Sequence, residues 1–242
     1  MLDQNAMFIE TGINPLLADL ADAMQLQHVD PQHPARRDAQ DFITEIFRHA
    51  HGAELSVYYP NLLQFSMEGK TRAVVGYRDG NSADLFSAQY FDHPIHEVTS
   101  ACLGRRVQPQ EMVEVGNLAI SDPGHARWII SATTAFLAAA GYRWVLFTAS
   151  LPLVNAFKRL GLKPLPLAVA DPNRLPERGS TWGSYYDGQP KVYLGDIHAG
   201  LNKLHTVGLK RPNLQNLLRS AHETGTRLGP YPPQTWQVLN DE

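Results

Sequence analysis

The chain of 242 residues has very little cysteine and no excess of charge of one sign. Its single cysteine, Cys102, cannot form an internal disulfide and cannot supply a thiolate cluster for zinc or iron-sulfur. The 21 Lys and Arg residues nearly balance the 24 Asp and Glu residues, giving a formal net charge of −3. No basic stripe or polybasic segment is present, so we expect no nucleic-acid partner and no electrostatic attachment to membranes.

The N-terminal segment lacks the basic region, apolar run and cleavage site of a secretory signal, which favours a cytosolic location. One long apolar stretch is present, because residues 128–154 carry a single charge, Arg143. This length would permit a membrane span. However, Gly141 is typical of a helix end, and residues 144–147 favour a strand. We therefore predict a buried helix followed by a buried strand, and no membrane span.

The hydrophobic pattern predicts an α/β fold with a central mixed sheet flanked by helices. We expect one helix over 36–49, a second that ends at residue 140, and a third over 152–160. Gly52 and Gly161 end the first and the third. The expected strands are 54–67 and 71–77 around a turn at Gly69, then 113–120, 144–147, 162–170 and 191–197. Helical turns are expected around 85–95, broken at Pro94, and in the tail over 198–205 and 214–222.

This pattern suggests a catalytic domain over residues 35–197 with two appendages. The N-terminal appendage, 1–34, has an amphipathic stretch at 16–26 and a connector with prolines and histidines at 28–34. The C-terminal appendage, 198–242, is helical and then proline-rich.

The most informative stretch is the strand Glu114-Val-Gly-Asn-Leu-Ala-Ile120, which is followed by the polar turn Asp122-Pro-Gly124 and an apolar helix. Pro123 and Gly124 end the strand and present the free amides of the next helix, which favour anions such as a pyrophosphate. A second strand, turn and helix follow. This order is the one that acyltransferases of the GNAT class use to hold a pantetheine thioester.

A family resemblance rests on motifs spread over about residues 35–200. They are Arg36 with Phe42-Ile43, Ala53-Glu54, Tyr59-Pro60, Gln89-Tyr-Phe-Asp92 with Pro94-Ile95, Glu114-Val-Gly-Asn-Leu-Ala119, Phe147-Thr-Ala149, Asn155 with Phe157, Arg159-Leu-Gly-Leu162, and Trp182-Gly183 with Tyr185-Tyr186. Together they resemble the thermostable haemolysin family. The order of that family's elements is similar to GNAT N-acyltransferases and especially to acyl-homoserine-lactone synthases, which place an acidic residue on the corresponding strand. The resemblance therefore implies acyl transfer.

An acyl transfer to an amine needs a base for the ammonium proton and a donor for the developing oxyanion. Glu114 is the candidate base or amine-binding carboxylate, acting directly or through water, and its alternative is a structural carboxylate paired with Arg105 or Arg106. Asn117, with a backbone amide of Leu118 or Ala119, is the candidate donor to the thioester carbonyl. The alternative for Asn117 is a turn or bulge residue beside Gly116.

Several further residues are candidates for binding the donor or the acceptor. Tyr186, with Tyr185, is expected to protonate the leaving thiolate, unless the two rings stack in a sheet. Asn155 is expected to meet the pantetheine arm or to cap its helix. The remaining candidates are Leu118, Ala119, Ile120, Gly124, His125, Ala126 and Phe157 for the cofactor, and Asp92, Arg106, Phe147 and Thr148 for the substrate.

The histidines and the cysteine are weaker candidates for a chemical role. His93 and His96 have a possible ligand spacing, but Pro94 between them spoils a helical geometry and no third ligand is evident, so we expect no metal. Nothing in the sequence activates Cys102, which favours a buried core cysteine over an acyl-accepting thiol.

The loop after the central strand departs from that of coenzyme A users, because it has one glycine and an acid, Asp122, in place of a basic, glycine-rich segment. Asp122 can cap the helix, but its charge disfavours a diphosphate. The expected donor is therefore an acyl-CoA or the phosphopantetheine thioester of an acyl-carrier protein, and the expected acceptor is a small-molecule amine. Two other functions stay open, a membrane-active haemolysin without catalysis and a domain that only senses acyl thioesters.

Overall fold

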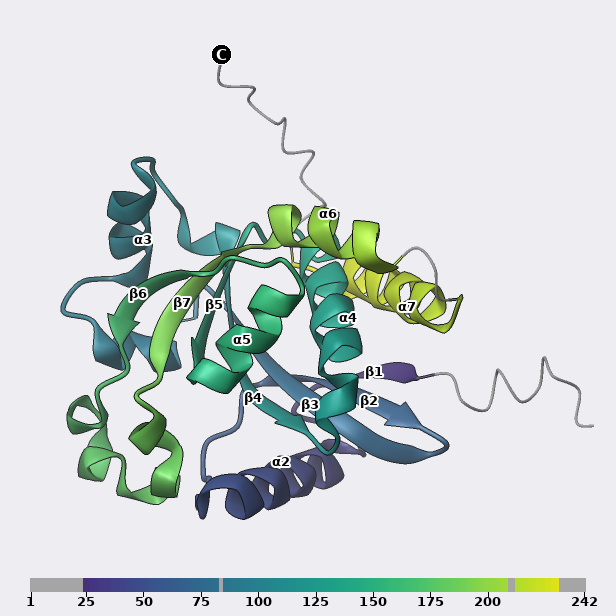
Figure 1. Cartoon of the computed structure of the whole chain (residues 1–242), viewed down its shortest axis with the longest axis horizontal. Coiled ribbons are helices and arrows are strands. Elements are labelled where there is room, and N and C mark those ends of the chain that lie inside the picture. Colours follow the sequence, from purple (N-terminus) through teal and green to yellow (C-terminus); the bar gives the residue numbers. More distant parts are fainter. Residues whose placement is uncertain (1–23, 83–84, 209–211, 231–242) are drawn as a thin grey trace, which may run out of the picture.

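The computed structural model describes residues 24–82, 85–208 and 212–230. In these ranges it forms a seven-stranded sheet covered by helices on both faces (Figure 1). The regular elements in chain order are β1 (Gln25–Val29), α2 (Arg36–His51), β2 (Asn61–Met67), β3 (Lys70–Asp79), α3 (Ile95–Leu103), β4 (Met112–Ile120), α4 (Ala126–Ala139), β5 (Trp144–Ala149), α5 (Leu151–Arg159), β6 (Leu165–Val169), β7 (Lys191–Asp196), α6 (Ile197–Gly208) and α7 (Pro212–Leu228).

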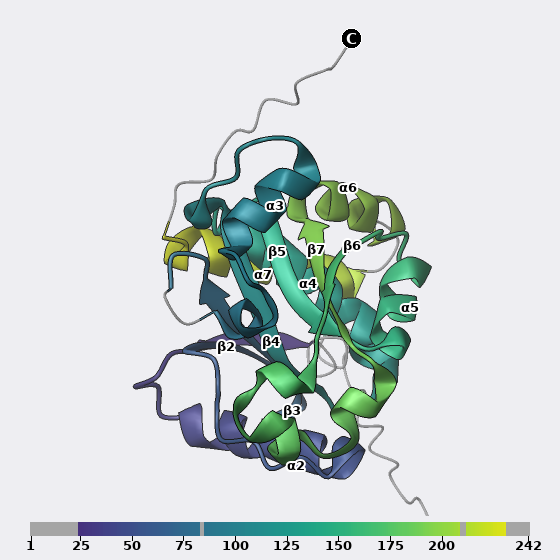
Figure 2. The same ribbon diagram turned by 90° about the vertical axis from the view of Figure 1, so that its left-hand side faces the viewer.

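Short 3-10 segments connect some of these elements. They are η1 (Phe86–Tyr90), η2 (Pro109–Glu111), η3 (Pro123–His125), η4 (Pro172–Arg174) and η5 (Pro176–Gly188). Segment η5 contains residues with left-handed backbone angles and forms a lobe beside the end of α2 (Figure 2).

The strands follow the spatial order β1-β2-β3-β4-β5-β7-β6. Neighbouring strands run antiparallel, except that β4 and β5 run parallel with helix α4 as their crossover. A parallel pair requires such a crossover, and the apolar α4 supplies it.

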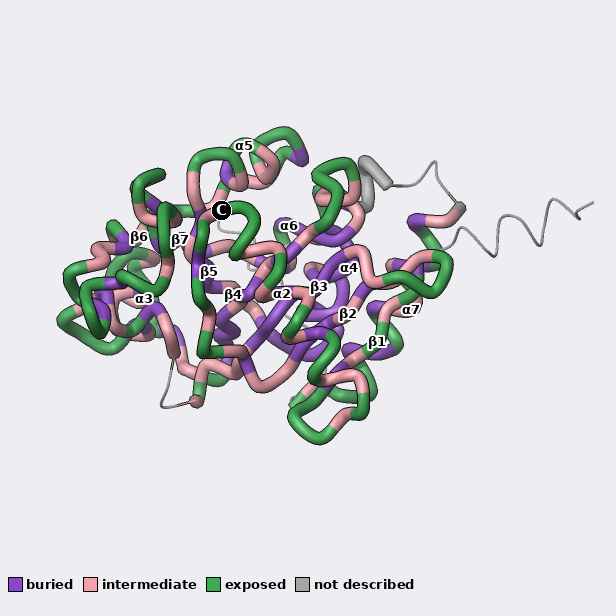
Figure 3. The backbone as a smooth tube through the Cα atoms, turned by 90° about the horizontal axis from the view of Figure 1, so that it is seen from below, coloured by how far each residue is buried: buried purple, intermediate pink, exposed green. Residues whose placement is uncertain are grey.

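The core follows from the alternation of side chains along the central strands. Leu62, Val74 and Ala119 face α2, whereas Leu63 and Val75 face α4 and α7. The buried residues lie along the sheet and α4 in the middle of the molecule (Figure 3). Helix α4 is covered by the sheet on one side and by α6 and α7 on the other, so it is apolar nearly all round.

The expected fold class is confirmed, and the run 128–154 forms the predicted helix and strand, α4 and β5. Gly52, Gly69 and Gly161 have φ of 66°, 71° and 77°, as their predicted roles at helix ends and in a turn require. The strand expected from Glu54 begins only at Asn61, because Pro60 lacks the amide for a ladder and the preceding segment runs across the end of α2.

The predicted connector 28–34 was wrong for its first residues, because His28 and Val29 belong to β1, which pairs with β2 as an edge strand. In the C-terminal appendage, α7 packs on α4 and contributes Leu217 and Ala221 to the main core. The expected boundaries near 34 and 197 stay predictions about which part of the chain folds by itself. Most of the stretch 16–26 and the prolines at 232 and 233 lie outside the described residues.

Candidate active site

The site begins where the two parallel strands separate. Pairing between β4 and β5 ends at Val115 and Phe147, although β4 continues to Ile120 and β5 to Ala149. At this point β4 carries a bulge, because Asn117 has a φ of 47° and the register with β3 shifts between Val74 and Gly76. A bulge bends a strand and increases its twist. The edge of β4 after Val115 is thereby left without a strand partner on the β5 side.

A cavity of about 960 Å³ opens at this separation and extends to both sides of it. Helix α4 lines it with one face, whose spacing of three and four residues places Ala126, Ile129, Ile130, Thr133, Thr134 and Leu137 together. We call the part between this face and Val75, Val115, Val145 and Ile197 the apolar arm.

The opposite part of the cavity is lined by aromatic side chains from three segments far apart in the sequence. We call it the aromatic arm, and it comprises Phe47 and His51 of α2, Phe86 and Tyr90 of η1, and Trp182, Tyr185 and Tyr186 of η5. A third group of lining residues is cationic. Among the described residues, the lysines and arginines that line the cavity are Arg159, Lys163 and Lys203 near the end of α5.

Glu114 does not line the cavity, and the residue is 1% exposed. One oxygen accepts a hydrogen bond from Phe86 N at 2.7 Å, and the other accepts from Ser87 N at 2.7 Å and from the Ser87 hydroxyl. The hydroxyl of Tyr59 donates a further bond to this carboxylate. The carboxylate is therefore held by four donors, and the one hydroxyl among them that belongs to a cavity-lining residue is that of Tyr59.

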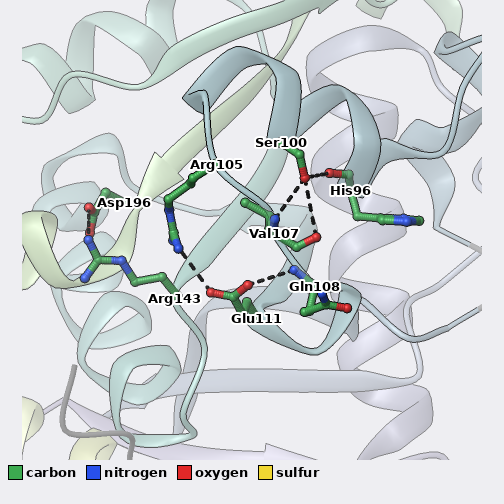
Figure 4. A network of polar contacts seen from close by, with 8 residues as sticks. All are labelled: His96, Ser100, Arg105, Val107, Gln108, Glu111, Arg143 and Asp196. Atoms are coloured by element: carbon green, nitrogen blue, oxygen red, sulfur yellow. Dashed lines mark hydrogen bonds and ion pairs between the residues drawn. The ribbon is translucent and has the colours of Figure 1, made fainter. Parts of the chain in front are cut away.

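The alternative that Glu114 pairs with Arg105 or Arg106 is wrong. Arg105 lies 3.6 Å from Glu111, whose other oxygen accepts from Gln108 N at 2.7 Å (Figure 4). Arg106 is exposed, and among the described residues no ion pair joins it to Glu114. The side chains of a strand alternate, and in this one Glu114 points to η1.

Tyr59 lies at the junction of the cavity and the buried carboxylate. Its ring packs directly over Gly116, where an added Cβ would lie 2.6 Å from Tyr59 Cζ and 2.8 Å from its hydroxyl oxygen. The guanidinium of Arg78 lies 4.8 Å from the ring centroid. Burial, and then the charge of Glu114, raise the pKa of Tyr59 well above its usual value. Tyr59 is therefore a neutral phenol that lines the cavity.

Asn117 has the bulge role that was its alternative. Its side-chain oxygen accepts a hydrogen bond from Tyr59 N at 2.8 Å, and its amide nitrogen is 3.5 Å from Val57 O. The side chain thus binds the segment before β2 to β4 and positions Tyr59. Asn117 also lines the cavity, but its oxygen faces the protein backbone and not an incoming carbonyl.

The turn after β4 carries its own anion. The carboxylate of Asp122 accepts a hydrogen bond from Gly124 N at 2.8 Å and lies 3.9 Å from His125 Nδ1. Asp122 was expected to cap the helix, but it caps the 3-10 segment η3, and the N-cap of α4 is His125. Gly124 and His125 do not line the cavity, whereas Ala126 does.

The predicted cofactor residues divide according to which side of their element they occupy. Leu118, Ile120 and Phe157 line the cavity, whereas Ala119 faces the opposite side and packs against α2. Asn155 is exposed and outside the cavity, and it does not cap α5, whose N-cap is Ser150. The expectation that Asn155 caps its helix was wrong, because α5 begins four residues before it. Its expected contact with the pantetheine arm stays a prediction.

The paired tyrosines lie in the η5 lobe and not in a sheet. The hydroxyl of Tyr186 is 2.5 Å from that of Tyr90, and the hydroxyl of Tyr185 donates to Thr148 O at 3.4 Å. Burial raises the pKa of Tyr186 to about 12, with an opposing contribution from Tyr90. Burial raises the pKa of Tyr185 as well. These phenols stay protonated at neutral pH and can act as proton donors.

The lobe is hydrogen-bonded to the end of α2 and to the segment that follows it. Glu54 N donates to Thr181 O at 2.7 Å, and the Ser184 hydroxyl donates to His51 O at 3.3 Å. Between them, Gly183 has a φ of 54° and approaches so closely that an added Cβ would lie 2.0 Å from His51 O. Only glycine fits such an approach in this conformation.

Among the expected substrate residues, Phe147 and Thr148 line the cavity, but Asp92 and Arg106 do not. Asp92 is exposed and forms an ion pair with Arg174 at 2.6 Å. Cys102 lies exposed on α3, so the expectation of a buried core cysteine was wrong.

Tyr59 and Phe47 are cavity residues to which no role was assigned from the sequence. The Tyr59-Pro60 pair stands among the motifs of the family resemblance and was the available signal.

Within the described ranges, no group of three or more His, Cys, Asp or Glu side chains is placed to hold a metal ion. In the same ranges no helix has the length and apolar character needed to cross a bilayer. The long apolar segment is accounted for by α4 and β5.

The mixed sheet with its separated parallel strands is a GNAT-like fold. A CoA-dependent acyl-homoserine lactone synthase, BjaI, solved with SAM and isopentyl-CoA, is similar with a TM-score of 0.51 and 14% identity, over 83% of this chain and 99% of that chain. The AHL synthase LasI is similar with a TM-score of 0.51 and 8% identity, over 73% of this chain and 91% of that chain. The sequence model of the thermostable hemolysin family matches residues 29–201, and the chain belongs to that family. A comparison with curated protein sequences gave no match.

Proposed function

We propose that this protein transfers an acyl group from an acyl thioester to the amine of a small molecule. The observation that carries the proposal is the cavity of about 960 Å³ at the separation of β4 and β5, with an apolar arm on one side and phenolic hydroxyls on the other. Such a concave, largely apolar site with a few polar groups is suited to a small ligand. The acyl chain occupies the apolar arm, and the pantetheine follows the unpaired edge of β4.

In the reaction, the neutral amine nitrogen attacks the thioester carbonyl carbon. The C–N bond forms, the C–S bond breaks, and a thiolate leaves. A backbone amide of Leu118 or Ala119 on the edge of β4 stabilises the developing oxyanion. Leu118, Ile120, Ala126 and Phe157 line the thioester path.

Two phenols divide the proton transfers. The proton of the attacking amine passes to the Tyr59 oxygen while the Tyr59 proton passes to Glu114, so the buried carboxylate acts as the base through the phenol. Tyr186, bonded to Tyr90, protonates the leaving thiolate. In this scheme Asn117 is a positioning residue that holds Tyr59, and it does not contact the carbonyl.

The donor is an acyl-CoA or the phosphopantetheine thioester of an acyl-carrier protein. Asp122 already accepts the Gly124 amide, which disfavours a diphosphate at this turn. The cationic residues Arg159, Lys163 and Lys203 offer another place for donor phosphates at the end of α5.

The proposal is tested by titrating the protein with acyl-CoA esters of graded length and with an acyl-carrier protein, measuring thermal stabilisation and product mass. Stabilisation that grows with chain length is expected from ligand linkage and from burial of each added methylene. Absence of binding to every thioester would overturn the proposal. Lysis of red cells without a thioester, equal in Tyr59→Phe, would support the membrane-active alternative.

Tyr59→Phe supplies the kinetic part of the test. This variant keeps the ring over Gly116 and removes only the hydroxyl, so kcat is expected to fall by about 10²–10⁴ while the affinity for the thioester is kept. Tyr58→Phe is the matched control, because its hydroxyl bonds Thr44 and Leu55 and does not line the cavity. Equal turnover in both variants would remove Tyr59 from the mechanism.

A further inference from the structure

The proposed transfer has to remove two protons from the attacking nitrogen. An alkylamine is an ammonium ion at neutral pH, and it must lose one proton before its nitrogen can attack. The nitrogen loses a second proton as the C–N bond forms, and the relay through Tyr59 to Glu114 takes that one. The first proton needs a separate base among the groups that line the cavity.

Most titratable side chains that line the cavity are unsuited to take this first proton. In the described ranges, four of them are phenols with raised pKa values and three are lysine or arginine cations. They are Tyr59, Tyr90, Tyr185, Tyr186, Arg159, Lys163 and Lys203. The carboxylate of Asp196 accepts hydrogen bonds from Arg143 at 2.6 Å and from Ala199 N at 2.8 Å, at the start of α6. His51 is the titratable group that remains.

His51 is the last residue of α2, and its ring lies in the aromatic arm. The ring centroid is 5.2 Å from that of Tyr185, with the two planes at 87°, and 6.1 Å from that of Phe47. The Tyr185 hydroxyl donates to Thr148 O, one residue beyond the last pair of β4 and β5. The imidazole is therefore one ring away from the separation of the two strands.

The backbone of His51 is held in place, whereas its ring nitrogens are accessible. The His51 carbonyl accepts from the Ser184 hydroxyl at 3.3 Å, and Gly52 ends α2 directly after it. Among the described residues, no hydrogen bond or ion pair reaches the ring nitrogens, and neither nitrogen is a buried atom without a partner. A ligand in the cavity can therefore bond the imidazole directly.

Burial lowers the pKa of His51, so the imidazole is neutral at neutral pH and carries a free lone pair. The titratable group packed against the ring is Tyr185, a neutral phenol. Glu54, in the segment that follows α2, is exposed and forms no ion pair with His51 among the described residues. An imidazole with a lowered pKa also returns a proton to water readily after each turnover.

We propose that His51 is a second catalytic base, which accepts the first proton of the acceptor amine when the amine enters the cavity as an ammonium ion. An N–H bond of the ammonium breaks, a new N–H bond forms on the imidazole, and the neutral nitrogen then attacks. The reaction yields an amide, a thiol and one proton, which His51 releases to water. Exchange with water restores Glu114 and Tyr186, because the first has gained one proton and the second has given one up. This inference rests on the proposed acyl transfer.

The test compares ethylamine, an ammonium ion at neutral pH, with trifluoroethylamine, which is largely neutral there because fluorine withdraws electrons. For each amine, kcat/KM is measured with the thioester that the protein binds, in the unmodified chain and in His51→Gln, whose amide does not accept a proton. With ethylamine at neutral pH, kcat/KM should fall about 10²-fold in the variant. This loss should shrink about tenfold per pH unit as the pH rises toward the pKa of the amine. With trifluoroethylamine the two chains should agree within about threefold.

His49→Gln is the matched control, because His49 lies on the same helix, is exposed and does not line the cavity. A merely structural role of His51 would give a loss that is equal for both amines and independent of pH, and this result would overturn the inference. Equal turnover of ethylamine by His51→Gln and His49→Gln at neutral pH would overturn it as well. In both cases acyl transfer itself stands.

Imidazole NMR gives a readout that needs no turnover, with the His51 resonance assigned by its absence from His51→Gln. This resonance is expected to report a neutral ring at neutral pH and to shift when ethylamine is added to the protein. Both results together support the inference even if neither amine is acylated. A ring that is protonated at neutral pH, or a resonance that ethylamine leaves unmoved, overturns it. Failure to bind any thioester is a separate result and counts against the proposed function.

Discussion

The buried Glu114 carboxylate makes a sharp prediction about stability. In Glu114→Gln, one oxygen becomes an amide that donates, yet Phe86 N and Ser87 N donate to opposite oxygens at 2.7 Å each. Whichever way the amide turns, one backbone N–H meets another donor. Hydrogen bonds to a charged group are worth about 1.5–3 kcal/mol, and a buried unsatisfied donor costs about 1–3 kcal/mol. The free energy of unfolding should therefore fall by about 3 kcal/mol or more.

Glu111→Gln is the matched control. Glu111 is also buried, but a glutamine oxygen can still accept from Gln108 N, and the ion pair with the half-exposed Arg105 contributes less than about 1 kcal/mol. Urea unfolding, followed by circular dichroism, gives both values. A loss in Glu114→Gln within about 1 kcal/mol of the control would refute the donor arrangement around Glu114. The strong loss also means that turnover in Glu114→Gln does not isolate a chemical role, for which Tyr59→Phe is the appropriate variant.

Three further predictions follow from the same geometry. Thr133→Phe should fill the apolar arm and abolish the gain in affinity of long acyl thioesters, about 0.8 kcal/mol per excluded methylene. Thr133→Val, which replaces a buried hydroxyl without a partner, should bind these thioesters as the unmodified chain does. Titration calorimetry with two chain lengths measures both, and an unchanged chain-length dependence in Thr133→Phe would show that the acyl chain lies elsewhere. The pKa of Tyr186 is raised to about 12 from 10.0, so its contribution to the free energy of unfolding is fully present below pH 10. Roughly 2 kcal/mol of the free energy of unfolding should be lost as the pH rises from 10 through 12, because the unfolded chain releases the proton first. Urea titrations in that pH window that show no decline would contradict the burial of this phenol. Gly183→Ala should lower the free energy of unfolding by about 3 kcal/mol or more, because the added Cβ meets His51 O. Gly188→Ala, whose added Cβ has an ordinary contact of 3.7 Å, should lower it by less than about 1 kcal/mol. Equal thermal melts of the two variants would show that the lobe does not approach α2 as described.

The residues of the central strand show how far the sequence could lead. The apolar alternation and the proline and glycine after it placed a strand at 113–120 followed by a helix, and both are present. The choice between the two roles of Asn117 was open, because a bulge depends on the register with β3 and not on local sequence. Asn155 was misplaced for a related reason, since the start of α5 at Leu151 fixes which of its residues face the cavity.

The sequence alone determined most of the elements, the α/β class and the family resemblance, because periodicity, strand-forming residues and glycine positions are local signals. The tertiary structure decided which side chains meet. Tyr59 and Asn117 are 58 residues apart, and the ring of Tyr186 reaches Tyr90 across 96 residues. Such contacts follow from strand register, and a shift by one residue turns every side chain of a strand to the opposite face. The carboxylate on the central strand was therefore visible in the sequence, but its four donors and its path to the cavity through Tyr59 were fixed only by the packed sheet.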